Sequence, residues 1–269
     1  SEMCIRDSID TKTKALHRQE AKVVCVAGNS IETPRLFLMS ASSMFPNGLA
    51  NSSDQVGRNY MRHLTGSVYA RFDKPVNFYR GETMAGFLAD EVKNNPKRGF
   101  VGGYYLETLA LGPSFMGAFL EPGGWGKKFA DMMDGYRNLA GMWIVGEDMP
   151  QANNRITLGS AKDAFGLPAP NVHFDDHPND TAMRNHAYNV GEKIYKSVGA
   201  KQTWRTTPYP HTHNLGTMRM SAKKKDGVTN KWGRCHDIKN LFVSDGSVMT
   251  TGAACNPTLT IVALSLIHI

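Results

Sequence analysis

The sequence of 269 residues lacks the short motifs that would assign its chemistry directly. It contains no GxxxxGK(S/T) loop, no GxSxG elbow and no HExxH helix, which excludes a P-loop nucleotide site, a serine-hydrolase nucleophile and a zincin metal site. It also contains no GxGxxG. The nearest string, Gly124-Trp125-Gly126, lacks the third glycine and does not lie between a strand and a helix, so a complete dinucleotide cradle is missing.

Cysteine, long apolar runs and clustered charge are also scarce. The cysteines show no CxxC or finger spacing, so we expect neither disulfides nor a cysteine zinc site; they are Cys4, Cys25, Cys235 and Cys255. The longest apolar stretch, residues 259–267, is half the ~18 residues of a membrane span. The net charge of +7 is scattered, and the lysine run at residues 223–225 is typical of a solvated loop. We therefore expect no membrane span and no nucleic-acid partner.

The composition is that of a globular protein. Hydrophobic residues make up 41% of the chain and charged residues 20%, which is enough apolar surface for a core. The two ends fit less well, because residues 1–8 have no hydrophobic period and the apolar helical pattern stops at residue 264 without a C-terminal signal. We expect residues 1–8 and 265–269 to lie outside the fold, and the chain to be part of a longer protein.

The first strong local pattern is a strand followed by a helix. Residues 22–27 are an apolar run, which is typical of a strand buried on both faces, as in a parallel sheet. Thr33 is a suitable N-cap and Pro34 a suitable first residue for a helix over residues 35–42.

The same pattern returns near the other end of the chain. A strand is expected at residues 240–243, and Asp245-Gly246 forms the turn after it. Asn256 is then a suitable N-cap, and Pro257 a suitable first residue, for a helix that continues to residue 264.

The middle of the chain has a different character. It contains short alternating strands and a helix with apolar residues spaced by 4, 3, 4 and 4, from Met183 to Val198, which Asp180 or Thr181 would cap and Gly199 would end. The expected fold class is α/β plus α+β, a nucleotide-type domain split by a domain with a mostly antiparallel sheet and packed helices. The expected boundaries are residues 9–66, 67–207 and 208–264.

Two candidates for chemistry lie in the last of these segments. His211 and His213 occupy a loop rich in Pro, Gly and Thr, and a histidine can accept a proton from an alcohol at neutral pH. Asn256 at a helix N-cap is explained by capping alone, but the positive end of its helix could also stabilise developing negative charge. His173 and His177 flank two aspartates in a metal-like pattern that is more typical of a solvated loop, and we predict no metal site.

Several stretches carry a family resemblance through their order and spacing. They are VAGNSIETPRL at residues 26–36, the loop at residues 48–63 with VGRN at residues 56–59, HNLGTMRM at residues 213–220, and NLFVSDGS at residues 240–247 followed by NPTLT at residues 256–260. Together they resemble the glucose–methanol–choline (GMC) family of flavin oxidoreductases over most of residues 20–264. The sequence is most similar to bacterial sugar and polyol dehydrogenases, because Asn256 stands where other members have a second histidine.

The resemblance implies an FAD enzyme that oxidises a CH–OH group by hydride transfer. It implies that His213 is the base, that Asn256 holds the substrate oxygen, and that the split domain is a Rossmann-like FAD-binding domain around a substrate domain. It further implies contacts to FAD from a set of residues in the matching stretches. These are Thr33, Pro34, Asn59, Asp245, Gly246, Pro257 and Thr258.

The missing GxGxxG is the main departure from the family, which carries that motif at its N-terminus. We therefore expect this chain alone to be inactive. The implied partners are a small alcohol or sugar substrate and an electron acceptor, either a protein or a quinone. Two alternatives stay open: a flavin-containing lyase of the same family that does no redox chemistry, and a fragment or binding module without cofactor.

Overall fold

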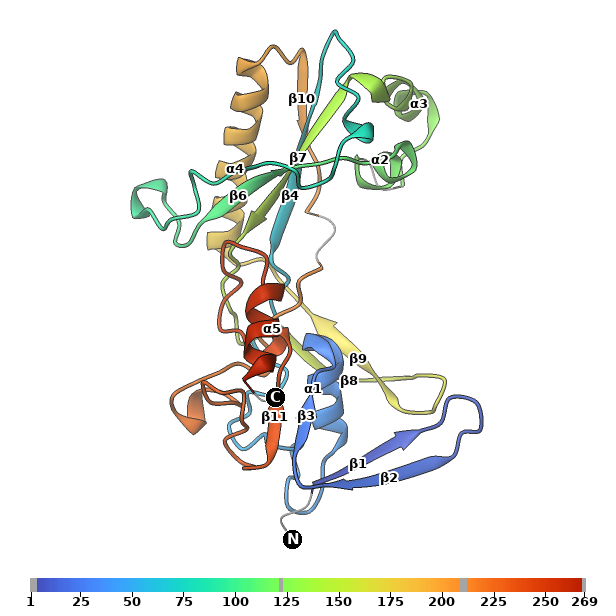
Figure 1. The fold of residues 1–269 in the computed structure, drawn as a ribbon, viewed down its shortest axis with the longest axis vertical. Coiled ribbons are helices and arrows are strands. Elements are labelled where there is room, and N and C mark those ends of the chain that lie inside the picture. Colours follow the sequence, from blue (N-terminus) through green and yellow to red (C-terminus); the bar gives the residue numbers. More distant parts are fainter. Residues whose placement is uncertain (1–3, 121–122, 209–211, 268–269) are drawn as a thin grey trace.

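The computed structural model describes residues 4–120, 123–208 and 212–267. They form an elongated molecule with an upper and a lower region in the view of Figure 1, and both ends of the chain lie in the lower region. The strands are β1 (Cys4–Ile9), β2 (Leu16–Ala21), β3 (Val24–Val26), β4 (Leu64–Arg71), β5 (Phe87–Leu88), β6 (Tyr104–Thr108), β7 (Leu139–Gly146), β8 (Arg155–Lys162), β9 (Pro168–His173), β10 (Gln202–Arg205) and β11 (Leu241–Val243). The helices are α1 (Asn29–Met39), α2 (Pro113–Leu120), α3 (Gly126–Asp134), α4 (Pro178–Ser197) and α5 (Thr258–Leu266).

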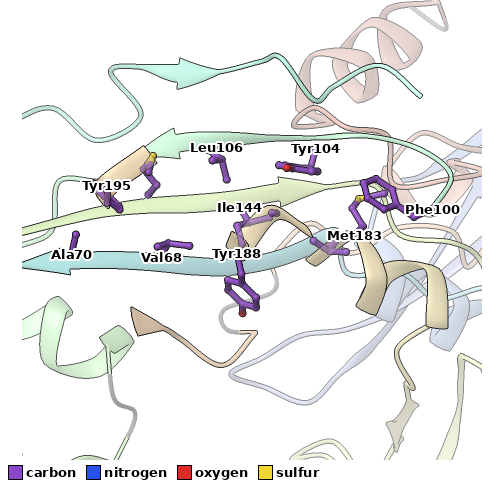
Figure 2. Close-up of a cluster of buried hydrophobic side chains, with 12 residues drawn as sticks. Val68, Ala70, Phe100, Tyr104, Leu106, Ile144, Met183, Tyr188 and Tyr195 are labelled. Carbon is purple, nitrogen blue, oxygen red and sulfur yellow. The ribbon is translucent and has the colours of Figure 1, made fainter. Parts of the chain in front are cut away.

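The upper region is built on an antiparallel sheet. Within the described residues it has five strands in the order β10-β4-β7-β6-β5. Helix α4 covers one face, and Figure 2 shows Met183, Tyr188 and Tyr195 beside Val68 and Ile144 of the central strands. The other face packs against α2. The mixed α/β architecture with a mostly antiparallel sheet is the predicted one.

Both faces of the central strand β4 are therefore buried. On one face Val68 and Ala70 contact the α4 side, and on the other Tyr69 packs with Met116 of α2 and with Leu139. Helix α4 begins after His177, whose Nδ1 accepts the N–H of Asn179 at 3.0 Å. The predicted caps Asp180 and Thr181 were wrong because Pro178 already opens the helix, whereas the predicted end at Gly199, with a φ of +92°, is confirmed.

The lower region contains a parallel strand pair, β3 with β11, in which Leu241 is opposite Val24. Side chains from α1, β11 and the loop at residues 48–56 form a common core with Leu264 of α5. Antiparallel hairpin β8–β9 packs beside α1, where Arg35 Nη2 bonds Asp163 Oδ2 at 2.6 Å.

Helix α1 starts five residues earlier than the sequence pattern predicts. It follows Gly28, and the side chain of Asn29 accepts the N–H of Ile31 at 2.8 Å. Pro34 consequently lies inside the helix rather than at its first position, and Thr33 is not the cap. The expectation fails because the Thr33 hydroxyl is engaged elsewhere, by Gly28 N–H and by a distant carboxylate.

The two ends of the described chain carry regular structure. Strand β1 pairs with β2 in a largely exposed antiparallel hairpin, although residues 1–8 were expected to have no element. Helix α5 continues to Leu266, two residues beyond the predicted end, and its Leu259 is 82% exposed. No helix in the parts of the chain that the structure describes is both long and apolar enough to cross a bilayer.

Candidate active site

The stretches with VGRN and HNLGT run antiparallel beside each other. Met61 and Leu215 exchange two backbone hydrogen bonds of 3.0 Å, and Gly57 N–H donates to Thr217 O at 2.8 Å. The approach is closest at Gly216, which has a φ of +93° and where a Cβ atom would lie 2.1 Å from Asn59 O. Only glycine fits there, so this residue fixes the spacing between the two segments.

The HNLGT segment is also tied to the first turns of α1. Pro34 has no N–H to give to the carbonyl of Ser30, four residues back in the helix. The hydroxyl of Thr217 donates to that carbonyl instead, at 2.8 Å, and the Ser30 hydroxyl donates to Asn214 O at 2.7 Å. The unusual position of Pro34 therefore creates an attachment point for the candidate catalytic segment.

Asp245 joins the carboxyl ends of the two parallel strands. Its Oδ2 accepts the Thr33 hydroxyl at 2.5 Å and the Asn29 N–H at 3.0 Å, and its Oδ1 accepts the Ser247 N–H at 2.8 Å. Asp245 and Thr33 are both buried. Their polar atoms thus organise the two turns from within, at the sheet edge where open α/β folds bind ligands.

His213 lies half-buried at the end of its segment. Burial lowers its pKa below the ordinary 6.5, and the Glu107 carboxylate opposes this shift. His213 is consequently neutral at pH 7 and able to accept a proton. Its Nδ1 lies 2.8 Å from Nδ1 of His63, a fully buried residue to which the sequence assigned no role.

A buried acidic group acts on both His213 and Asn256. Glu107 on β6 is 6% exposed, and its Oε1 accepts the Tyr105 hydroxyl at 2.7 Å and the Asn256 amide at 3.4 Å. Burial and the hydrogen bond to Glu107 raise the pKa of Tyr105, which therefore remains a donor. Nothing in the sequence singles out Glu107, because its partners come from distant parts of the chain.

Asn256 does not cap its helix. The N-cap of α5 is Pro257, with no side-chain cap hydrogen bond, and the Asn256 side chain turns to Glu107 instead. The predicted capping role was wrong because α5 begins at Thr258, so Asn256 lies one residue before the N-cap. The first N–H groups of α5 therefore stay open at the exposed Thr258, next to Asn256.

Three other residues that were predicted to contact FAD are buried. Asn59 is buried, with its amide on Gln55 Oε1 at 3.0 Å, and Gly246 and Pro257 are buried beside the same turns. His173 bonds Asp175 at 3.1 Å, while His211 falls outside the described residues. Across the described ranges no three His, Cys, Asp or Glu side chains gather as a metal site would require.

The arrangement fits a bound flavin. The open N-terminus of α5 carries partial positive charge, which suits a ring that becomes anionic on reduction. It lies next to Asn256 and thereby to the Glu107 and His213 pair, close to the carboxyl ends of β3 and β11. Hydrogen-bond donors and a neutral base thus come from the same few segments.

Comparison with known sequences gives the family. Residues 150–265 match the family model for GMC oxidoreductase. The 2-methyl-1,2-propanediol dehydrogenase of Mycolicibacterium austroafricanum is 38% identical over 96% of this chain and 49% of that protein. The fructose dehydrogenase large subunit of Gluconobacter japonicus is 32% identical over 94% of this chain and 47% of its own length. The chain spans about half the length of these curated relatives.

Solved structures share the fold. Pyridoxine 4-oxidase from Mesorbium loti has a TM-score of 0.61 at 17% identity and covers 96% of this chain and 52% of its own. Formate oxidase from Aspergillus oryzae RIB40, solved to study its FAD modification, has a TM-score of 0.65 at 17% identity, covering 97% and 55%. The chain thus shares its fold with these two oxidases.

The chain belongs to the GMC oxidoreductase family. Its cofactor is accordingly FAD, in agreement with the resemblance of the sequence motifs.

Proposed function

We propose that this chain is the catalytic part of an FAD-dependent enzyme that oxidises a CH–OH group of a small alcohol, polyol or sugar. The observation that carries the proposal is the neutral, half-buried His213 under the electrostatic influence of the buried Glu107, which also bonds Asn256. FAD, when bound, supplies the acceptor for the C–H hydrogen and its electron pair.

His213 is proposed as the general base. The hydroxyl O–H bond breaks, and its proton moves to the imidazole. The positive charge that forms there is stabilised by Glu107, whose negative charge already favours the protonated form. A base whose pKa lies below the working pH is ready before substrate arrives.

Asn256 is proposed to orient the substrate. Its amide can donate to the substrate oxygen, and its hydrogen bond to Glu107 holds the amide group in place. The 3.4 Å length leaves this contact easy to rearrange on binding. Glu107 adds an acceptor to the same wall, which favours substrates with a second hydroxyl group.

The cofactor-binding residues are proposed in two groups. Pro257 and Thr258 form the N-terminus of α5, which is proposed to face the flavin ring. Asp245, Gly246, Thr33, Pro34 and Asn59 form the wall and floor of its site, Asp245 and Thr33 mainly by holding the two turns together. The FAD phosphates need a Gly-rich cradle that this sequence lacks, so we propose that a further segment supplies it and that this chain alone is inactive.

The substrate class follows from the relatives as a proposal. One is named for a branched diol and another for fructose. A small diol, polyol or sugar is therefore the first class to test. The electron acceptor is proposed to be a quinone or a redox protein.

The test is anaerobic mixing of the FAD-loaded protein that contains this chain with a panel of diols, polyols and sugars. Loss of the visible absorbance of oxidised flavin would support the proposal, and His213→Ala should slow it by ~10²-fold or more. Substrate turnover with the flavin remaining oxidised would favour the lyase alternative. No flavin binding and no turnover would favour a binding module.

A further inference from the structure

The buried histidine pair has a defined hydrogen-bond order. Nε2 of His63 lies 3.0 Å from the carbonyl oxygen of Ala253, and Nδ1 of His63 lies 2.8 Å from Nδ1 of His213. A carbonyl oxygen only accepts hydrogen bonds, so Nε2 of His63 carries the hydrogen. In a neutral imidazole the other nitrogen is then an acceptor, so Nδ1 of His213 must be the donor.

This order determines which nitrogen of His213 is basic. With its hydrogen on Nδ1, neutral His213 keeps the lone pair on Nε2. The reverse order would place a lone pair of His63 against the lone pairs of the Ala253 carbonyl. A doubly protonated His63 would satisfy both contacts, but it would place a charge on a side chain with 0% exposure.

We propose that His63 is a positioning residue that fixes His213 in its Nδ1–H tautomer, leaving Nε2 as the site that receives the hydroxyl proton. The catalytic part of this inference rests on the proposed function. The tautomer itself does not, because it follows from the protein's own contacts.

The pairing of the two segments explains why these rings meet. Met61 and Leu215 are opposed in an antiparallel bridge. Because the segments are antiparallel, the residue two positions after Met61 is opposite the residue two positions before Leu215. His63 is therefore opposite His213, with both side chains on the same face. The ring centroids are 5.0 Å apart, with the planes tilted by 46°.

The backbone of His63 is fixed on both sides. Asp148 accepts the N–H of Arg62 at 2.9 Å and the N–H of Leu64 at 3.0 Å, one with each carboxylate oxygen. This clamp holds His63 at a φ of +63°, a left-handed conformation that is uncommon for residues other than glycine.

The acceptor carbonyl is fixed by the same carboxylate. Gly252, which precedes Ala253, packs so closely that a Cβ atom would lie 2.6 Å from Asp148 Oδ1. One buried residue thus sets both partners of the His63–Ala253 hydrogen bond. Contacts that fix the ring orientation of a histidine also fix which of its nitrogen atoms carries the hydrogen. The contacts around His63 are of this kind.

The first experiment is NMR on the chain labelled with 15N at histidine, with the His213 signals assigned by their loss in His213→Gln. We expect Nδ1 of His213 to be protonated and Nε2 to be an unprotonated, pyridine-like nitrogen, whereas the exposed His17 should show fast tautomer exchange. A His213 with its hydrogen on Nε2, or exchanging as His17 does, would overturn the proposal. This measurement needs no variant at position 63.

The second experiment uses the matched pair His63→Asn and His63→Leu, which have the same branching. The Asn oxygen can accept from His213 Nδ1 and the Leu side chain cannot. In the FAD-loaded protein we expect His63→Leu to slow flavin reduction by about 10- to 100-fold, below the ~10⁴-fold that a wrong tautomer can cost. We expect His63→Asn to recover most of the rate and of the Nδ1–H signal.

The outcomes separate the two proposals. Equal rates for Leu, Asn and wild type would overturn the positioning role. Equal losses in Asn and Leu, with His213 still holding its hydrogen on Nδ1, would also overturn it, since the effect would then be structural. An Nδ1–H tautomer without any flavin reduction by alcohols would leave the His63 contact standing and remove the proposed function.

Discussion

β4 in the upper region and β3 in the lower region are both strands within a sheet, but they are covered very differently. Every residue of β4 except Arg71 is buried, between α4 on one face and α2 on the other. β3 belongs to a parallel pair in which Cys25 is exposed, and its neighbour α5 leaves Leu259 exposed. The upper region thus completes its own core, while the lower region leaves apolar surface available to other parts of a longer protein.

The two regions are therefore expected to contribute differently to the stability of the protein and to its chemistry. The upper region supplies packed apolar side chains, and it contributes Glu107 and Tyr105 to the site from one strand. His213, Asn256 and the turns at Asp245 come from segments that are held in place by specific hydrogen bonds. Changes in the first set should lower the free energy of unfolding, and changes in the second should lower the rate.

The largest expected effect is on stability, in the upper core. Ile144 is fully buried, so Ile144→Ala should lower the free energy of unfolding by about 2–5 kcal/mol. The exposed Leu259→Ala should change it by less than about 0.5 kcal/mol. Urea denaturation of the chain measures both. Similar decreases in the free energy of unfolding for the two variants would contradict the proposed difference between the regions.

The next effect is on rate. His213→Ala should slow flavin reduction by ~10²-fold or more, because the base is lost. His211→Ala, two residues away, is the control and should change the rate little. Stopped-flow flavin reduction measures both variants, and an equal loss in the control would mean that the base has been assigned to the wrong histidine.

Glu107→Gln should give a smaller and more specific change. Because Glu107 raises the pKa of His213, its removal lowers that pKa further. The rate is present above the pKa of the base and lost as the pH falls through it, so this acid limb should move to lower pH. The maximal rate should fall by about tenfold, since the charge on protonated His213 loses its partner.

The control for Glu107→Gln is Glu82→Gln, which changes an exposed residue on the same region. Its pH profile should be that of wild type. An acid limb that stays in place in Glu107→Gln would show that Glu107 does not act on His213 electrostatically.

The last expected effect is spread over several pH units and concerns pH and stability at the N-terminal end of α4. Burial raises the pKa of Asp180 to about 7 from 3.8. The folded state therefore holds a proton on Asp180 that the unfolded state has lost, so this group should make the free energy of unfolding fall as the pH rises from about 4 to about 7, by at most ~1.4 kcal/mol per pH unit. Burial also raises the pKa of the nearby Asp148 to about 6, which adds to the slope of the wild-type protein. Asp180→Asn should flatten this slope. Denaturation curves across this range test it, with the exposed Asp90→Asn as control; an unchanged slope in Asp180→Asn would contradict it.

Local patterns in the sequence predicted the elements that depend on neighbours along the chain. The apolar period of α4 and the left-handed Gly199 at its end are such cases. Capping was predicted less well. Thr33 and Asn256 are both suitable caps by residue type. The Thr33 hydroxyl instead donates to Asp245, far away in the sequence, and Asn256 lies one residue before the N-cap of α5 with its amide N–H on Glu107.

The site was predicted in part for the same reason. His213 and Asn256 stood out through their motifs, and these assignments stay predictions. His63 and Glu107 did not stand out, because their importance depends on register and on packing between distant segments. His63 could have been found from the antiparallel pairing of Met61 with Leu215, had that pairing been known.

The close approach at Gly216 has a consequence for genetics. A Cβ atom at this position would strike the Asn59 carbonyl, so most substitutions would push apart the two segments that carry the histidine pair. A screen of random variants for lost activity would then return Gly216 alongside His213. Libraries that seek new substrates should leave this glycine constant and vary the wall around Glu107 instead.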